Sequence, residues 1–148
     1  MSCKGKLYPF IVSNPAVPVT GVYVDMRDAT LAANEIRYGG VDVPLLWNAF
    51  AQHGLGRDAA SAGSNDADAT SSFASPHGRN ATVRFAAGAP ARLYVGGYEA
   101  RAVPVADTDP ATPLPDTFEM TSGRYSFTVV APGFGESRFD ARSALVSG

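Results

Sequence analysis

Apolar residues recur at two different spacings along the chain, and the spacing changes near residue 78. Upstream, a three- and four-residue period predicts a helix with one apolar face, formed by Met26, Ala29, Ala33 and Ile36. Asp25 is a suitable N-cap for this helix. Gly39 and Gly40 predict its end, because glycine readily adopts the left-handed backbone that closes helices.

A second short helix is predicted from Asp42, a candidate N-cap, to His53. Pro44 fits its first turn, and Gly54 is placed for a left-handed C-terminal cap. Its apolar face is predicted to consist of Leu46, Ala49, Phe50 and His53. Two short helices joined in this way form an αα-hairpin, which buries little surface unless another surface covers it.

Residues 57–77 are small, polar and turn-prone, which predicts a flexible linker. Asn65, Asp66 and Asp68 carry the oxygen ligands that calcium prefers. The run lacks the spacing and terminal glutamate of an EF-hand loop, so a solvated linker is favoured over a calcium site.

Downstream, the period becomes two, as in half-buried β-strands, starting with Val83 and Phe85. The pattern predicts a tight hairpin of 92–95 and 98–103 around Gly96-Gly97, then a proline-rich connection over 104–115. It predicts a second hairpin of 117–120 and 124–131, and a further strand starting at 137–139. Because a sheet that ends there lacks a closing strand, we expect an exposed edge that can pair with another chain.

The predicted fold is therefore mostly β, a small antiparallel β-sandwich preceded by a short helical hairpin, α+β overall. Three parts are expected: a helical segment over 1–56, a linker over 57–77 and a β domain over 78–148. The 148 residues carry a net charge of −2 without a basic cluster, which argues against nucleic-acid binding. No apolar run approaches the ~20 residues that a membrane span needs.

Residues for catalysis are scarce. The sequence contains no H-E-x-x-H, G-x-S-x-G or phosphate-loop motif, and one cysteine and two histidines offer no metal spacing. Cys3 is interpreted as an inert thiol and His53 as a surface residue at a helix end. Asp107 and Asp109 are interpreted as solvated. We therefore predict no catalytic residue and no metal ligand in this chain.

Three tyrosines form the candidate binding surface: Tyr94, Tyr98 and Tyr125. Neighbouring tyrosines on a sheet can stack on sugars or on polypeptide, so the expected ligand is a protein or a polysaccharide. Aromatic pairs across strands also stabilise sheets without any ligand, and this alternative is favoured.

Residues 24–56 carry four short motifs in a fixed order: Met26-Arg27-Asp28-Ala29, Glu35-Ile36-Arg37-Tyr38-Gly39-Gly40, Leu46-Trp47-Asn48-Ala49-Phe50-Ala51 and Gly54-Leu55-Gly56. In order and spacing they resemble the closing helices of the fungalysin family of secreted zinc metallopeptidases. Residues 92–139 resemble an extra β domain that follows the protease in some members, and also carboxypeptidase-regulatory, prealbumin-like sandwiches.

The resemblance implies a parent enzyme that cleaves peptide bonds with zinc-activated water, and whose zinc ligands lie upstream of these helices. This chain would then be a non-catalytic, extracellular C-terminal portion without its own cofactor, and its secretion signal would lie upstream. The protease domain is expected to pack on Leu46, Trp47 and Phe50. The alternative is a stand-alone extracellular binding or structural β-sandwich module.

Overall fold

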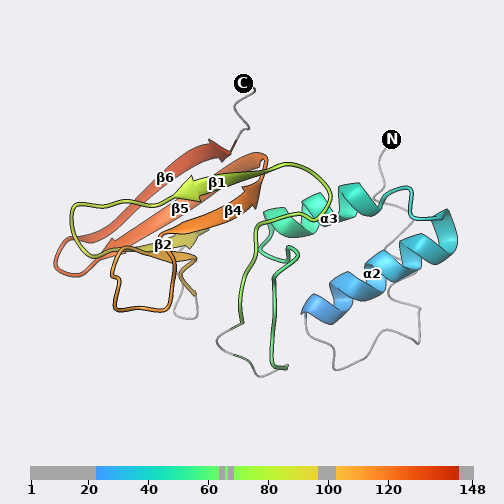
Figure 1. The fold of residues 1–148 in the computed structure, drawn as a ribbon, viewed down its shortest axis with the longest axis horizontal. Coiled ribbons are helices and arrows are strands. Elements are labelled where there is room, and N and C mark those ends of the chain that lie inside the picture. The colour runs from blue at the N-terminus through green and yellow to red at the C-terminus, as the bar shows by residue number, and fades with distance from the viewer. Residues whose placement is uncertain (1–22, 64–65, 67–68, 97–102, 144–148) are drawn as a thin grey trace.

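The computed structural model describes residues 23–63, 66, 69–96 and 103–143 (Figure 1). Within them, helices α2 (Tyr23–Tyr38) and α3 (Val43–Gln52) precede the strands. The strands are β1 (Asn80–Arg84), β2 (Arg92–Val95), β3 (Ala106–Asp107), β4 (Thr117–Thr121), β5 (Gly123–Ala131) and β6 (Gly135–Ser143). They form two antiparallel sheets, β1-β4 and β3-β2-β5-β6. The predicted α+β class, a helical segment followed by antiparallel sheets, is confirmed.

Both helices end where the glycines predict. Gly39 and Gly40 follow α2 with φ of 62° and 75°. After α3, Gly54 has φ of 81° and donates its N–H to the Ala51 carbonyl, while the Leu55 N–H donates to the Phe50 carbonyl. This pair of bonds is the Schellman motif, so the predicted left-handed cap is confirmed.

The predicted N-caps of the two helices are less accurate than the predicted C-terminal ends. Asp25 lies within the first turn of α2 instead of capping it. Asp42 does precede α3, but its side chain makes no capping hydrogen bond. The Asp42 carboxylate instead accepts a hydrogen bond from the Asn34 side chain at 3.3 Å, which joins the two helices.

The buried faces of the helices differ from those predicted. In α2 the buried residues are Arg27, Thr30, Ala33 and Asn34. Met26 and Ile36, predicted to be inside, are 44% and 84% exposed. In α3 the buried residues are Val43 and Ala51. Polar side chains of α2 thus share its buried face with Ala33, while the larger apolar residues Met26 and Ile36 face outward.

The segment predicted as a flexible linker carries ordered contacts in its described part. Short bridges pair Leu55 with Ser72 and Ala60 with Thr70, and Phe73 pairs with Met120 of β4. Phe73 is 7% exposed and belongs to the hydrophobic core. Residues 69–77 therefore form part of the fold, because one aromatic side chain anchors a stretch of otherwise small residues.

The predicted second hairpin is wrong in its pairing, although its two strands exist. Strand β4 pairs with β1, whereas β5 pairs with β2 and β6, so the chain crosses from one sheet to the other at Ser122. The predicted tight hairpin at Gly96-Gly97 is also wrong, because Leu93 pairs with Ala106 of β3 instead. Residues 98–102 of that prediction lie outside the described residues.

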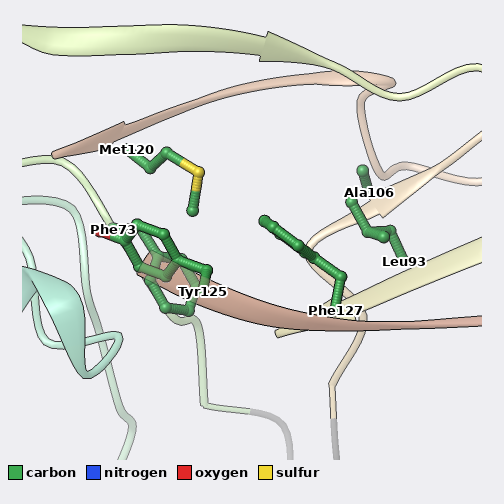
Figure 2. Close-up of a cluster of buried hydrophobic side chains, with 6 residues drawn as sticks. All are labelled: Phe73, Leu93, Ala106, Met120, Tyr125 and Phe127. Carbon is green, nitrogen blue, oxygen red and sulfur yellow. The ribbon is translucent and has the colours of Figure 1, made fainter. Parts of the chain in front are cut away.

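The core lies between the two sheets (Figure 2). Met120 extends from β4 towards Tyr125 and Phe127 of β5, and Phe73, Leu93 and Ala106 complete the buried cluster. The Tyr125 hydroxyl donates to the Thr121 carbonyl at 2.9 Å. This bond spans the sheet crossing and resembles the tyrosine corner of β-sandwiches, which fixes a chain where it changes sheets.

The β5–β6 hairpin turns at Pro132-Gly133, as predicted, with Gly133 at φ of 83°. Strand β6 pairs with β5 along its whole length and forms one edge of the larger sheet. Most of its residues are exposed. Neither described helix is long and apolar enough to cross a membrane.

Candidate functional site

Arg27 is the centre of a buried polar junction between the two helices and the loop after α3. Its Nη1 donates to the Gly56 carbonyl at 2.7 Å and to the Leu55 carbonyl at 3.4 Å. Its Nε pairs with Asp28 at 2.8 Å. The guanidinium carbon lies 4.8 Å from the ring centre of Trp47, which is cation–π distance. Arg27 thus ties α2 to α3 and to the loop after α3.

The loop that Arg27 holds is joined to the following segment by main-chain hydrogen bonds. The Gly56 N–H donates to the Ser72 carbonyl at 2.7 Å, and the Arg57 N–H to the Ala74 carbonyl at 2.9 Å. A Cβ at Gly56 would collide with both of these carbonyl oxygens. Glycine is therefore required here by the close approach of two backbones.

A second polar contact closes the other end of the helix pair. Asn34 is fully buried, and its side-chain oxygen accepts the Asp42 N–H at 3.3 Å. Most buried amides in proteins are hydrogen-bonded, and this contact joins the start of α3 to α2. Arg27 and Asn34 lie on the same face of α2 and hold α3 at two points.

The junction brings together residues from three of the four motifs: Arg27-Asp28, Trp47 and Gly54-Leu55-Gly56. Nothing in their spacing along the chain announces this contact, and sequence reasoning missed it. A signal was available: Arg27 occupies a helix position that turns inward, and Trp47 is the single tryptophan. Three of the four motifs thus supply residues to one structural junction.

Residues 11–59 match the family model of the fungalysin metallopeptidase (M36). The fungalysin match contains both helices and the Arg27 junction up to Ala59, while the strands, which begin at Asn80, lie outside it. No curated protein and no solved structure matches the chain. The fungalysin relation therefore rests on the helical part.

The described side chains do not form a site for the zinc ion that a fungalysin metallopeptidase uses. Across residues 23–63, 66, 69–96 and 103–143, no three His, Cys, Asp or Glu side chains are grouped to hold a metal ion. His53 directly follows α3 and His77 precedes β1, and both side chains are exposed. The Asp66 carboxylate accepts the Ala62 N–H at 2.6 Å and closes its own loop.

The prediction that Asp107 is solvated is wrong. The residue is 4% exposed. Its carboxylate accepts the Asp109 N–H at 2.8 Å and pairs with the Arg92 guanidinium at 3.3 Å. The hydrogen bond that the Arg92 guanidinium donates to the Asp107 carboxylate also raises the pKa of Arg92. This carboxylate is fully engaged in holding β3 to β2.

The structure does not bring the three candidate tyrosines onto one surface. Tyr94 pairs with Thr128 and Tyr125 with Ala141, which places the two rings on opposite faces of the larger sheet. Tyr94 is 6% exposed and Tyr125 is 4% exposed. Tyr98 lies outside the described residues. For Tyr94 and Tyr125, burial favours sheet packing over stacking on a ligand.

A hollow of about 760 Å³ lies beside the junction, lined by the start of α2, the end of α3 and the loop up to Ser71. Tyr23, Met26 and Leu55 contribute apolar walls, and His53 and Asp66 contribute polar atoms. These groups do not form a nucleophile–base pair, so the hollow is suited to receiving side chains of another surface rather than to chemistry.

Proposed function

We propose that this chain is a non-catalytic C-terminal portion of a secreted, fungalysin-type zinc metalloendopeptidase. In this proposal the helical segment completes the helical lobe of the protease. The β part is an accessory domain that stabilises the enzyme or binds substrate or a surface. The zinc, its ligands and the general base belong to the protease domain and not to this chain.

The observation that carries the proposal is the junction around Arg27. Its members belong to the motifs that resemble those of fungalysins, and they lie within the matched residues 11–59. They form no catalytic constellation. Shared residues that hold backbone together, rather than meeting around a reactive atom, fit a structural part of an enzyme.

The apolar surface of the helices supports a covering partner. Tyr23, Ile36 and Val41 are each more than 70% exposed, and Leu45 is 60% exposed. Large exposed apolar side chains that gather in one patch often mark an interaction surface. The predicted contact residues Leu46, Trp47 and Phe50 are half-buried in this chain. We propose that the protease domain covers these exposed side chains and fills the hollow by α2.

The β part is proposed to act with the protease rather than as a loosely tethered unit. The main-chain bonds of Gly56 and Arg57 connect it to the helical segment. The Arg57 side chain also pairs with Glu119 of β4 at 2.6 Å. An accessory domain attached in this way can transmit its own stability to the end of the protease.

A split-enzyme experiment tests the proposal. A fungalysin protease core that lacks its closing helices is mixed with the purified chain, and zinc-dependent casein hydrolysis and thermal stability are measured. We expect the chain alone to be inactive and the mixture to gain both activity and stability. Chelator-sensitive hydrolysis by the chain alone would contradict the non-catalytic role.

Matched variants locate the contact. Ile36→Asp, on α2, should abolish the gain, because it places a charge in the proposed interface. Phe134→Asp is the control, since Phe134 is equally exposed at 82% but lies in the β5–β6 turn. Failure of the core to bind the unaltered chain would favour the alternative, a stand-alone extracellular module.

A further inference from the structure

Strand β6 presents a long, regular edge that no other described strand pairs with. It runs from Gly135 to Ser143, pairs with β5 without a bulge and contains no proline. Among the described strands, only β5 pairs with it. Natural edge strands of this length are normally shortened, bulged or covered, because their free main-chain groups attract other strands. The edge thus suggests a partner.

The alternation of hydrogen bonds identifies the main-chain groups that point away from the sheet. The Gly96 N–H donates to the Ser126 carbonyl, so the groups of Ser126 face β2 and those of the next residue, Phe127, face β6. Phe139, opposite Phe127, then directs its groups towards β5. The outward N–H and C=O groups belong to Glu136, Arg138, Asp140 and Arg142.

We propose that β6 pairs antiparallel with β6 of a second copy of the chain, about a two-fold axis at Phe139. In this register Glu136 lies opposite the partner's Arg142, and Arg138 lies opposite the partner's Asp140. Each outward main-chain group then meets a complementary group. Each charge on that face meets an opposite charge. The larger sheets of two copies would join into one continuous sheet.

Charge selects this register over its neighbours. Sliding by two residues one way sets Arg138 against itself and Glu136 against Asp140. Sliding the other way sets Asp140 against itself and Arg138 against Arg142. Like charges directly opposite each other destabilise a strand pair. Shifts by one residue turn the wrong main-chain groups towards the partner. Only the register centred on Phe139 pairs the whole strand with opposite charges.

The core-side face of β6 adds an aromatic contact at the same axis. Phe139 is 48% exposed and stacks on Phe127, with ring centres 5.5 Å apart. In the proposed dimer it lies in a non-hydrogen-bonded pair with the partner's Phe139, where side chains approach most closely. Four aromatic rings would then line up across the two-fold axis, and each Phe139 would lose its exposed surface.

A second copy fits better than an unrelated peptide, because the complementarity is symmetric. An isologous interface requires one surface to match itself under a two-fold rotation. The order of charges from Glu136 to Arg142 is negative, positive, negative, positive about a central Phe139. Reversing the strand, as antiparallel pairing does, converts this order into its complement.

Cysteine cross-linking tests the register on the full chain, with Cys3 replaced by serine. Phe139→Cys should form a disulfide-linked dimer on mild oxidation. Ser137→Cys should not, because it faces the partner's Ala141 and lies roughly 13 Å from its own counterpart. A mixture of Ser137→Cys and Ala141→Cys chains should cross-link. Equal cross-linking of Ser137→Cys alone and Phe139→Cys would overturn the register.

Charge exchange tests the complementarity by sedimentation equilibrium. Glu136→Arg should weaken dimerisation at least about tenfold, because the change acts twice in a symmetric dimer. Adding Arg142→Glu should restore it to within about threefold of the unaltered chain. Circular dichroism verifies that each variant keeps its β structure. A chain that stays monomeric up to about 1 mM, or a double variant no better than the single one, would overturn the proposal.

Discussion

Replacing Arg27 by alanine removes the centre of the junction, and its cost can be worked out from the contacts. The Gly56 carbonyl would lose a charge-assisted hydrogen bond in a buried site, which costs about 1.5–3 kcal/mol. Loss of the stacking on Trp47 adds about 0.5–2 kcal/mol. Because these terms overlap, we expect a total of about 3 kcal/mol. That is a large share of the 5–15 kcal/mol typical of a domain.

Urea unfolding followed by tryptophan fluorescence measures this cost at its source, because Trp47 is the only tryptophan and lies against Arg27. Arg27→Lys should be intermediate, since an ammonium keeps the charge but cannot reproduce the planar stacking and fork of hydrogen bonds. The exposed Arg79→Ala is the control and should change stability by less than about 0.5 kcal/mol. A loss below about 1 kcal/mol for Arg27→Ala would refute the assignment of Arg27 as the centre of the junction.

Three further predictions concern the backbone contact, the core and the sheet crossing. Gly56→Ala should destabilise the fold by about 1–3 kcal/mol, because the added Cβ would collide with two carbonyl oxygens. Gly88→Ala is the control and should be neutral, because a Cβ there has no neighbour within 4 Å. Thermal unfolding compares the two variants. Phe73→Ala should lower the free energy of unfolding in urea by about 3–5 kcal/mol, whereas the exposed Phe134→Ala should lower it by less than about 0.5 kcal/mol. Equal effects of the two changes would contradict the role of Phe73 as an anchor and favour the flexible linker. Burial raises the pKa of Tyr125 above its ordinary value of 10.0. Above about pH 10 the unfolded state therefore releases a proton that the folded state keeps, so the free energy of unfolding should fall as the pH rises. Tyr125→Phe should be less stable by about 1 kcal/mol at pH 7, through loss of its hydrogen bond, but should show a shallower decline above pH 10 in unfolding titrations.

The ends of the helices were predictable because glycine has a local and specific role there. Gly39, Gly40 and Gly54 all adopt the left-handed backbone that their positions indicate. The buried faces were not predictable, because periodicity assumes that apolar residues turn inward. Here Arg27 and Asn34 turn inward to satisfy backbone and amide groups of other segments, and Ile36 faces outward. Of the predicted apolar stripe, Ala33 is buried, whereas Met26 and Ile36 are exposed.

The strands were predictable one by one, whereas their partners were not. Alternation along 117–131 reveals two strands but carries no information on whether they pair with each other. The Tyr125 hydroxyl and the core side chains Met120 and Phe127 decide that β4 and β5 face each other from different sheets. Likewise, composition suggested a linker at 57–77, and one residue, Phe73, changed its role.

The candidate site was accessible to sequence reasoning only as a set of motifs. The four motifs contain Arg27, Trp47 and Gly56 but do not reveal that these residues meet. Their contact depends on the angle between α2 and α3 and on the approach of residues 72–74, which are long-range features. The placement of the candidate tyrosines is a long-range feature too, since Tyr94 and Tyr125 lie on opposite faces of one sheet.

The crossing between β4 and β5 has a consequence for the order of folding. Among the described pairings, β5 with β6 is a local hairpin, while β1 must find β4 and Phe73 must find Met120 across long stretches of chain. Local pairings close quickly, and distant ones are slowed by the entropy of loop closure. We expect the hairpin to form early and the second layer to close over it late. During that interval the aromatic face of β5 stays open to water, so refolding yield should fall as protein concentration rises.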